Sequence, residues 1–326
     1  MKRVFVSEPI HADAMKLLAN EVEIVMGSNQ DTLLQQAGDC DGILIRSHKV
    51  PGDFLANAPK VKVVGKHGIG VDNIDVDAAT ARGILVVNAP ESNIHSVAEH
   101  ALGMILASAK NFLQGDAMLR SSGFKHRNAI VGTELKGKTI GIIGLGKIGL
   151  QLARKLQCLD VKIIAFDPYA KPQLAKELDI GLVSNIDLVF AESDFISLHV
   201  PLTNTTRGMV GKDDFVKMKK SAYLINVSRG EIVRENDLYE ALKNKQIRGA
   251  ALDVFEKEPP APDNPLFMLD NVLLSPHNAA LTEDALIAMA TQSAQGILDC
   301  LNGKIPKYVV NPQVLNSNSL KVSFFN

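Results

Sequence analysis

The chain has 326 residues, and its 35 basic side chains almost balance its 36 acidic ones. This balance creates no overall field that would attract nucleic acid or an anionic membrane, so we expect neither as a partner. The length exceeds the size at which a single hydrophobic core stops growing, and it predicts two domains.

Cysteine usage and the start of the chain favour a cytoplasmic protein. Cys40, Cys158 and Cys300 form no CxxC pair, which argues against a zinc site, a redox dithiol and a disulfide framework, and we expect no metal. The opening residues, MKRVFVSEPI, hold an apolar run too short for the core of a signal peptide. No stretch of about 18 apolar residues occurs, so no transmembrane helix is predicted.

Short β-branched runs alternate with helical patterns from the first residues onward. The strand-like runs are KRVFVS, EVEIVM, GILIRS, VKVVGKHG and ILVVNAP, and the helical patterns between them are HADAMKLLAN, TLLQQAGD, PGDFLANA and DVDAATARG. Such alternation predicts a parallel sheet with crossover helices. From Asn93, the sequence NIHSVAEHALGMILASAKNF keeps small and apolar residues at helical spacing for about five turns, which indicates a long helix connecting two domains.

A second series of strand-like runs follows that helix. The runs are TIGIIGL, VKIIAFD, FISLHV, AYLINVS, GAALDV and NVLLSPH, and they predict a second parallel sheet of six strands. After them, Thr282 can cap a long helix whose first residues, Glu283 and Asp284, suit its positive end. The segment beyond this helix is too short for a domain, so we expect the helix and tail to return to the first domain.

The predicted fold is therefore α/β, with two doubly wound parallel-sheet domains. One domain is discontinuous and comprises residues 1–99 and 282–326, and the other, residues 100–281, is inserted into it. This arrangement explains why a glycine-rich turn that normally opens a domain begins only near residue 144.

Gly144, Gly146 and Gly149 form a GxGxxG pattern between a predicted strand and a predicted helix. In that context the glycines allow a tight turn, a close approach of the backbone to a pyrophosphate and close packing of the helix on the strand, which predicts a Rossmann domain. Asp167 ends the next strand, at the spacing of an acid that binds ribose hydroxyls. Its carboxylate would repel a 2′-phosphate about 4 Å away by about 4 kcal/mol at an effective dielectric near 20, so NAD is expected rather than NADP. Lys171 could soften this preference, and the glycines could instead serve packing alone.

Polar side chains follow the strands of the second series, and ligands of an open parallel sheet lie beyond the carboxyl ends of its strands. These residues are His199, Asn226, Ser228, Arg229, Asp253 and His277, with Glu258 soon after Asp253. Arg229 offers a planar, charged fork for a carboxylate. A histidine such as His277 can exchange a proton with an oxygen near neutral pH, and Glu258 would favour its imidazolium form. The set predicts reduction of a 2-oxo acid or oxidation of a 2-hydroxy acid.

Each of these side chains also has an ordinary structural interpretation. Arg229, Glu258 and His277, the predicted catalytic triad, could instead be a surface cation, a loop acid and a structural histidine, respectively. Asp253 could cap a turn, and His199 and Asn226 could bond the backbone of their loops. The combination supports a site, whereas no single residue does.

Eight motifs in order give the chain a specific resemblance. They are GKHGIGVDNID, NAPESNIHSVAEHALGMIL, ELKGKTIGIIGLGKIG, the acid in FDP, LHVPLT, LINVSRGEIV, GAALDVFEKEPP and SPHNAALT. Together they resemble the D-isomer-specific 2-hydroxyacid dehydrogenase family. The resemblance implies a Rossmann NAD-binding domain inserted into a flavodoxin-like substrate domain, and a homodimer formed through the cofactor domains.

The resemblance also implies roles for individual residues. Arg229 would anchor the substrate carboxylate, Glu258 would tune the histidine, and His277 would donate or accept the proton. The implied cofactor-binding positions are Gly144, Gly146, Lys147, Ile148, Gly149, Asp167, His199, Pro201, Asn226, Val227, Ser228, Asp253 and Asn278. The implied substrate contacts, besides Arg229 and His277, are Arg46, Ser47, Gly68, Ile69, Gly70 and Asn93. For Arg46, a solvated cation at the end of a strand is an equal alternative.

Among the subgroups of the family, the motifs IRS, GIGVDNID, NAPESN and SVAEHALGMILA are most similar to phosphoglycerate dehydrogenase. A phosphorylated substrate needs further cations, which Arg46, Lys49, Lys66 or His67 could supply. Glyoxylate or hydroxypyruvate reduction, or turnover of another small 2-hydroxy acid, is the enzymatic alternative. A nucleotide-sensing corepressor that retains the fold is the alternative outside enzymes.

Overall fold

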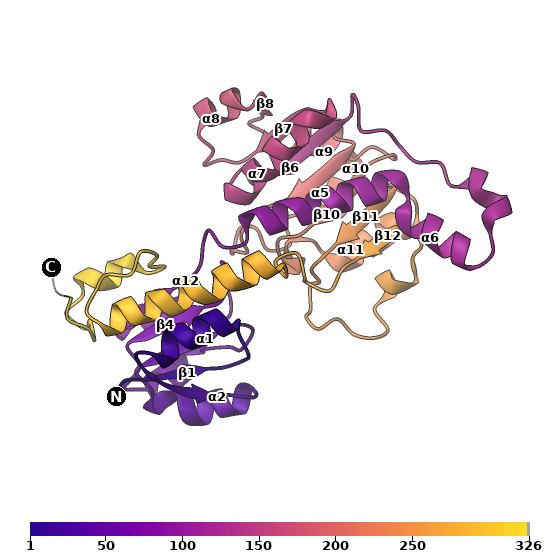
Figure 1. Cartoon of the computed structure of the whole chain (residues 1–326). Helices are drawn as coiled ribbons and strands as arrows, with labels where there is room; N and C mark the ends of the chain where they lie inside the picture. The colour runs from indigo at the N-terminus through magenta and orange to yellow at the C-terminus, as the bar shows by residue number, and fades with distance from the viewer. Residues whose placement is uncertain (325–326) are drawn as a thin grey trace. The chain divides into compact units, whose positions relative to one another are not determined.

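The computed structural model describes residues 1–324, apart from the side chain of Thr32. Its contacts divide the chain into two compact units, with Met1–Asn93 and Leu281–Asn326 forming unit 1 and Ile94–Ala280 forming unit 2 (Figure 1). The long helix after Asn93 belongs wholly to unit 2, which therefore begins a little before the expected residue 100. In the described part of the chain, no helix has both the length and the apolar character needed to cross a membrane.

Unit 1 contains a five-stranded parallel sheet. Its strands are β1 (Arg3–Val6), β2 (Glu23–Met26), β3 (Gly42–Ile45), β4 (Val63–Lys66) and β5 (Leu85–Val87). Their order is β2-β1-β3-β4-β5, which is the flavodoxin-like order, and every neighbouring pair is parallel. The predicted strand runs and the fold class of this part of the chain are confirmed.

Helices cover both faces of this sheet because its strands carry apolar side chains on both sides. The helices are α1 (Ala12–Ala19), α2 (Gln30–Gln36), α3 (Gly52–Ala56), α4 (Val76–Ala81) and α12 (Glu283–Leu301), with 3-10 turns η1 (Ala37–Asp39) and η6 (Pro312–Asn316). Val4 packs in one core with Ile297 of α12, whereas the next residue, Phe5, packs in the other core. At Gly65 of β4, a Cβ would lie 2.6 Å from an atom of Ile297, so the glycine lets α12 approach the sheet closely.

The long C-terminal helix α12 begins as predicted. The Thr282 side chain accepts a hydrogen bond from the backbone N–H of Ala285, and Glu283 and Asp284 lie in the first turn. Such a cap stabilises a helix by about 1 kcal/mol, because it satisfies a backbone donor that has no partner inside the helix. In Figure 1 the helix runs beside α1 and along the sheet of unit 1.

Unit 2 contains a seven-stranded parallel sheet. Its strands are β6 (Thr139–Ile143), β7 (Lys162–Phe166), β8 (Ile180–Leu182), β9 (Phe195–Leu198), β10 (Tyr223–Asn226), β11 (Gly249–Leu252) and β12 (Val272–Leu274). The order β12-β11-β10-β9-β6-β7-β8 contains the Rossmann arrangement, with the direction of strand addition reversing at β6. The prediction of six strands omitted β8, a short edge strand whose sequence, IGL, has a glycine at its centre.

Two helical layers cover the sheet of unit 2. Its helices are α5 (Ile94–Lys110), α6 (Phe112–Arg120), α7 (Lys147–Leu156), α8 (Pro172–Glu177), α9 (Ile186–Glu192), α10 (Lys212–Lys217) and α11 (Glu235–Lys243). The 3-10 turns are η2 (Phe124–Ala129), η3 (Gln157–Leu159), η4 (Gly230–Ile232) and η5 (Pro265–Met268). Helices α5 and α7 share one apolar core, and α9, α10 and α11 share the other. The sequence patterns did not predict α6 or η2, and neither buries a residue.

Candidate active site

The carboxyl ends of the strands of unit 2 carry most of the predicted site residues. Because all the strands are parallel, these ends lie along one edge of the sheet, where open α/β sheets bind ligands. The glycine turn follows β6, the segment 227–229 follows β10, Asp253 follows β11, and the loop 275–279 follows β12. Sheet topology therefore brings residues together that are far apart in the sequence.

The three glycines of the turn after β6 have the three properties that a dinucleotide-binding turn requires. Gly144 has a φ of 95°, which a residue with a side chain rarely adopts. A Cβ at Gly149 would lie 2.2 Å from the carbonyl oxygen of Gly144, so this glycine allows the close packing of helix on strand. A Cβ at Gly146 would meet no described atom within 4 Å, which leaves the backbone open to a ligand. The turn thus fits a pyrophosphate at the N-terminus of α7, where Lys147 and Ile148 begin the helix.

Asp167 lies beside this turn. Its Oδ2 accepts a hydrogen bond of 2.8 Å from the backbone N–H of Leu145, and its Oδ1 accepts one of 2.8 Å from the N–H of Tyr169. The carboxylate is therefore adjacent to the glycine turn, as an acid that binds the ribose of a dinucleotide must be.

His199 lies where β9 meets the glycine turn, with its backbone N–H bonded to the carbonyl of Ile143 at 2.7 Å. Its Nε2 lies 2.9 Å from the Ser197 hydroxyl. Burial lowers the pKa of His199 to about 4, so the ring is neutral at pH 7. Pro201 follows in the same loop, where its carbonyl accepts from the hydroxyl of Thr206 at 2.6 Å. His199 is thus suited to a polar or packing contact with a cofactor but not to binding its phosphates by charge.

Asn226 shapes the turn that presents Arg229. Its Oδ1 accepts from the N–H and the hydroxyl of Ser228 at 3.1 and 2.8 Å, and its Nδ2 donates to the carbonyl of Arg229 at 2.9 Å. Gly230 then allows a close approach of two segments, because a Cβ there would lie 1.9 Å from the carbonyl of Phe255. The side chain of Asn226 is thus used inside the turn, which agrees with its structural interpretation, and Val227 is buried beside it.

Glu258 and His277 are in direct contact. His277 Nδ1 lies 2.6 Å from Glu258 Oε2, while Glu258 Oε1 accepts from the backbone N–H of Phe255 at 3.1 Å. Burial by itself raises the pKa of Glu258, but the hydrogen bond from His277, the charges of His277 and Arg229 and the Phe255 N–H together lower it below its usual value. Glu258 is therefore a carboxylate at neutral pH, and it directs the opposite nitrogen of His277, Nε2, away from itself.

Asp253 holds the loop that carries His277. Its side chain is 1% exposed, and its oxygens accept from the backbone N–H groups of Asn278 and Ala279 at 2.9 and 3.0 Å. The hydroxyl of Ser275 lies 2.5 Å from Asp253 Oδ1, and the His277 N–H donates to the Asp253 carbonyl at 2.7 Å. These bonds hold His277 at a φ of 50°, a left-handed conformation that residues with side chains adopt only when their surroundings enforce it. Asp253 therefore supports the histidine loop, a role that the residue types alone did not indicate.

Unit 1 carries the predicted substrate contacts Gly68, Ile69, Gly70 and Asn93. Gly68 has a φ of 132°, and its carbonyl accepts from the N–H of Ala89 at 2.9 Å. The Asn93 side chain is buried, and within the described residues its Oδ1 has no hydrogen-bond partner. Its Nδ2 lies 3.9 Å from the sulfur of Met289. A buried amide oxygen without a partner is costly, so Asn93 Oδ1 offers an acceptor to a ligand or a water molecule.

Arg46 and Ser47 follow β3 at the carboxyl edge of the sheet of unit 1. Their backbone N–H groups both donate to Glu8, at 3.0 Å each, and the hydroxyl of Ser47 also donates to Glu8. His67 is nearby and buried, and burial together with the charge of Arg46 lowers its pKa to about 4. His67 is therefore neutral at pH 7 in the ligand-free protein, so Arg46, Lys49 and Lys66 are the charged members of the set that the sequence offered.

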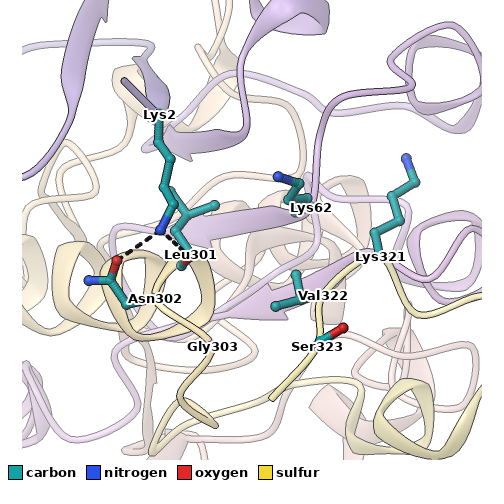
Figure 2. Close-up of a pocket in the computed structure, with 8 residues that line it drawn as sticks. All are labelled: Lys2, Lys62, Leu301, Asn302, Gly303, Lys321, Val322 and Ser323. Carbon is teal, nitrogen blue, oxygen red and sulfur yellow. Dashed lines mark hydrogen bonds between the residues drawn. The ribbon is translucent and has the colours of Figure 1, made fainter. Parts of the chain in front are cut away.

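A cavity of about 320 Å³ lies in unit 1 at the amino ends of β1 and β4, the edge opposite Arg46 (Figure 2). Its lining residues are Lys2, Lys62, Leu301, Asn302, Gly303, Lys321, Val322 and Ser323. The lysine ammonium groups of this cavity bond to other groups of the protein. Lys2 donates to Asn302 at 2.9 Å, and Lys62 pairs with Asp41 at 2.9 Å. Lys321 donates to backbone carbonyls of the segment before β4. These lysines therefore join the ends of unit 1 and do not mark the predicted site.

Several residues that hold the predicted site residues within each unit were not predicted. They are Glu8, His48 and Asn73 in unit 1 and His100 and Ser275 in unit 2. Glu8 lies just beyond the end of β1, so reading the strand ends of the first sheet as closely as those of the second would have found it. His100 Nε2 lies 3.2 Å from the Ser275 hydroxyl, and no spacing in the sequence connects these two residues.

Comparison with known proteins places this geometry in context. Residues 102–279 match the model described as D-isomer specific 2-hydroxyacid dehydrogenase, NAD binding domain, which confirms the prediction of an NAD-binding domain. The D-3-phosphoglycerate dehydrogenase of Methanocaldococcus jannaschii is 45% identical over 314 residues, which cover 95% of this chain and 60% of that protein. The glyoxylate reductase of Korarchaeum cryptofilum is 34% identical over 322 residues, which cover 96% of this chain and 97% of that protein.

Solved structures show the same fold. The D-lactate dehydrogenase of Aquifex aeolicus, complexed with NAD and lactic acid, matches with a TM-score of 0.85 and 28% identity, covering 95% of this chain and 99% of that one. The chain spans about 60% of the length of the D-3-phosphoglycerate dehydrogenase from Methanocaldococcus jannaschii.

Proposed function

Because the chain belongs to the D-isomer specific 2-hydroxyacid dehydrogenase family, we propose that it is an NAD-dependent oxidoreductase acting on the CH–OH group of a small anionic 2-hydroxy acid. The observation that carries the proposal is the 2.6 Å contact between His277 Nδ1 and Glu258 Oε2, near Arg229 and in the unit that holds the glycine turn. Each group has a distinct task in exchanging hydride and proton with a 2-oxo acid.

The proton would be moved by His277. With Nδ1 bonded to the Glu258 carboxylate, Nε2 is the nitrogen that can give a proton to the substrate oxygen during reduction, or take it during oxidation. Glu258 remains ionised at neutral pH because its pKa is lowered, and its negative charge stabilises the imidazolium. Bound NADH supplies the hydride that reaches the substrate carbon.

Arg229 would bind the substrate carboxylate. The turn that Asn226 holds fixes its backbone, and Gly230 keeps the following segment close to the loop of Glu258. A guanidinium can form two parallel hydrogen bonds to a carboxylate and is always charged. Such a contact would orient the carbonyl carbon for hydride transfer while leaving the carbonyl oxygen to His277.

The substrate we propose first is a 3-phosphoglycerate-like acid. In support, the Methanocaldococcus jannaschii relative, at 45% identity, is a D-3-phosphoglycerate dehydrogenase, and Arg46 places a cation at the carboxyl edge of unit 1. Arg46, Gly68, Ile69, Gly70 and Asn93 remain the proposed substrate contacts of unit 1, whereas the N–H and hydroxyl of Ser47 are bonded to Glu8. Glyoxylate or hydroxypyruvate is the second candidate, because the glyoxylate reductase relative matches over 97% of its own length.

A panel of 2-oxo acids tests both proposals. NADH absorbance at 340 nm would be followed with 3-phosphohydroxypyruvate, hydroxypyruvate, glyoxylate and pyruvate, and each reaction would be repeated with NADPH. We expect the highest kcat/KM with 3-phosphohydroxypyruvate and NADH, because Asp167 next to the glycine turn disfavours a 2′-phosphate. Equal efficiency with NADH and NADPH would contradict the cofactor assignment, and no turnover of any acid would favour a nucleotide-sensing protein.

We also propose that the chain forms a homodimer through unit 2. An arm made of α6, η2 and the segment up to residue 131 extends from the sheet of this unit and buries no side chain within its helices (Figure 1). Its exposed large apolar residues are Phe112, Leu113, Leu119, Phe124 and Val131, each at least 50% exposed. Exposed apolar side chains in this number mark an interaction surface. Sedimentation equilibrium would reveal the dimer, and a monomer at micromolar concentration would contradict it.

A cytoplasmic location remains part of the proposal. Cys40 and Cys300 are buried, Cys158 is exposed, and all of them are free thiols. Burial raises the pKa of Cys300 to about 12, so this thiol is inert at neutral pH. Free thiols of this kind are typical of a reducing compartment.

A further inference from the structure

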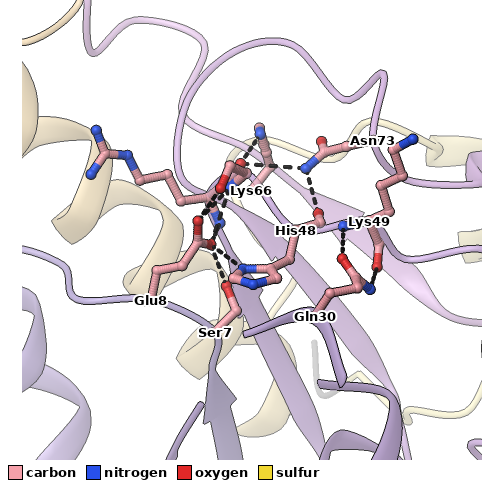
Figure 3. A network of polar contacts seen from close by, with 9 residues as sticks. Ser7, Glu8, Gln30, His48, Lys49, Lys66 and Asn73 are labelled. Atoms are coloured by element: carbon pink, nitrogen blue, oxygen red, sulfur yellow. Dashed lines mark hydrogen bonds and ion pairs between the residues drawn. The ribbon is translucent and has the colours of Figure 1, made fainter. Parts of the chain in front are cut away.

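The carboxylate of Glu8 is the centre of a polar network in unit 1 that links the end of β1 to the loop after β3 (Figure 3). Its Oε2 accepts from the hydroxyl of Ser7 at 2.6 Å and from the backbone N–H of Arg46 at 3.0 Å. Its Oε1 accepts from the backbone N–H of Ser47 at 3.0 Å and also from the hydroxyl of Ser47. His48 Nδ1 lies 2.9 Å from Oε2. One carboxylate thus gathers donors from two successive residues of the loop, Arg46 and Ser47, and the ring of the next residue, His48, lies beside it.

The chemistry of the network requires an ionised acceptor at this position. The side chain of Glu8 is only 16% exposed, and such burial by itself raises the pKa of its carboxyl. Hydrogen bonds from Ser47, Ser7, His48 and the Arg46 N–H outweigh this effect and lower the pKa to about 2. Glu8 therefore stays charged throughout the neutral range, and the hydroxyls of Ser7 and Ser47 and the backbone N–H groups of Arg46 and Ser47 donate to it.

The carbonyl groups of the same loop are held from the other side. Asn73 Nδ2 donates to the carbonyls of Arg46 and His48 at 3.3 and 2.6 Å, and Lys66 Nζ donates to the carbonyl of Arg46. Gln30 then forms a pair of bonds with the backbone of Lys49, at 2.7 and 2.8 Å. The loop from Arg46 to Lys49 is thus bonded at both its donors and its acceptors, a density of bonding that an ordinary surface loop rarely has.

The hydroxyl of Ser47 has only one proton to donate, and Glu8 accepts it. An anionic substrate offers acceptors and needs donors, so the Ser47 hydroxyl cannot serve as its donor while this bond is present. The permanently charged side chains of the loop are those of Arg46 and Lys49, and Arg46 is the one whose backbone N–H is bonded to Glu8. Within the loop, the Ser47 side chain is thus bonded to Glu8, whereas the Arg46 side chain carries a charge that can bind an anion.

We propose that Glu8 is a positioning residue, which fixes the backbone of Arg46 and Ser47 so that Arg46 is presented to the anionic substrate, and that Ser47 acts through Glu8 and not on the substrate directly. This inference rests on the proposed function only for the identity of the substrate. The ordering of the loop by Glu8 is independent of any activity.

Replacing Glu8 tests the two parts separately. In Glu8→Gln, an amide NH₂ group faces the donors that the carboxylate accepted, whereas Glu8→Asp retains the charge on a shorter side chain. Glu23→Gln is the matched control, because Glu23 is an exposed acid of the same unit that pairs with Arg3 at the surface. Hydrogen–deuterium exchange of the full chain would report on the amides of Arg46 and Ser47, with thermal unfolding showing that each variant is folded.

We expect the Arg46 and Ser47 amides to exchange about 10-fold faster or more in Glu8→Gln, as the loss of a hydrogen bond to a charged acceptor predicts, and to remain protected in Glu23→Gln. Glu8→Asp should recover part of the protection. Unchanged exchange in Glu8→Gln would overturn the proposal even if the protein has no dehydrogenase activity. The failure of this inference and the failure of the proposed function can thus be told apart.

Steady-state kinetics test the second part. With the best 2-oxo acid, Glu8→Gln should raise KM so that kcat/KM falls about 10- to 100-fold, while the dissociation constant of NADH stays within about 2-fold of the wild type. Ser47→Ala should lower kcat/KM in the wild type but not further in Glu8→Gln, because both changes break the same bond. Additive losses, or a loosened loop with unchanged KM, would show that Glu8 does not act on substrate binding.

Discussion

Two loops of this molecule are organised by a single carboxylate, one in each unit. In unit 2, Asp253 accepts the backbone N–H groups of Asn278 and Ala279 and so holds the loop of His277. In unit 1, Glu8 accepts the backbone N–H groups of Arg46 and Ser47. Each carboxylate follows the end of a strand, and each gathers the loop that follows the next strand in its sheet.

The two carboxylates differ in how deeply they are buried. We expect the loss of the more buried one to affect mainly the stability of the fold, and the loss of the less buried one to affect mainly the position of its loop. The side chain of Asp253 is 1% exposed and supports a residue with a left-handed backbone, whereas that of Glu8 is 16% exposed and collects side-chain hydroxyls as well as backbone donors. A fully buried set of donors left without its acceptor costs folding free energy, because no water replaces the lost bonds. The backbone groups of a surface loop can bond to water instead. The loss of their carboxylate acceptor therefore changes mainly the position of the loop and its side chains.

The largest expected effect concerns His277, whose loop is held by the more deeply buried carboxylate, Asp253. We expect His277→Ala to lower kcat by about 10²- to 10⁴-fold, the usual contribution of a general acid or base, because the change removes the group that we propose to exchange the proton. The dissociation constant of NADH, measured by fluorescence titration, should stay close to that of the wild type. Lys220→Ala, a change at an exposed residue of the same unit outside the arm, serves as the control. Wild-type kinetics in His277→Ala would remove the basis of the proposed mechanism.

A smaller effect is expected when the deeper carboxylate itself is changed. Asp253→Asn leaves one oxygen where two had accepted hydrogen bonds, so we expect the free energy of unfolding to fall by about 1–3 kcal/mol and kcat to fall as the His277 loop loosens. Urea denaturation measures the first quantity, with Asp263→Asn at an exposed position as the control. Glu8→Gln should destabilise the protein less. If Glu8→Gln lowers the free energy of unfolding as much as Asp253→Asn does, the difference in burial does not explain how the two carboxylates act on their loops.

The smallest effect is the acid sensitivity of the shallower carboxylate. The folded state lowers the pKa of Glu8 from 4.5 to about 2, so its stabilising contribution is complete above pH 4.5 and disappears as the pH falls toward 2. Between pH 6 and pH 4 this loss amounts to about 1 kcal/mol. Denaturation of the wild type and of Glu8→Gln at these two pH values should show a smaller difference in stability at pH 4. A difference that does not depend on pH would mean that Glu8 is not ionised by its network.

The sequence predicted the strands, the long helices and the NAD-binding turn because their patterns are local. Buried runs such as TIGII and the cap at Thr282 depend on neighbours within a few residues. The short strand β8 was missed because three residues with a central glycine give no alternation, and α6 was missed because it buries no apolar face. Local patterns are informative only where an element packs against its own unit.

The residues of the candidate site likewise include some that local sequence predicted and some that only the fold reveals. The residue types of Arg229, Glu258 and His277 at successive strand ends predicted a chemistry, and the structure brings Glu258 and His277 to 2.6 Å. The use of Asp253 as a support for the histidine loop could not be predicted, because its bonds connect residues 25 and 26 positions away that only the parallel pairing of β11 and β12 brings together.

By itself, the sequence determined the α/β class, the dinucleotide turn and the set of reactive side chains, because these depend on residue type and short-range spacing. Only the tertiary structure decided which polar residues face one another. Glu8 and the Arg46 loop are separated by 38 positions, and they meet because β1 and β3 are neighbours in the sheet. Hydrogen bonds depend on distances of a few tenths of an ångström, and such distances are set by strand order and register, which no short stretch of sequence contains.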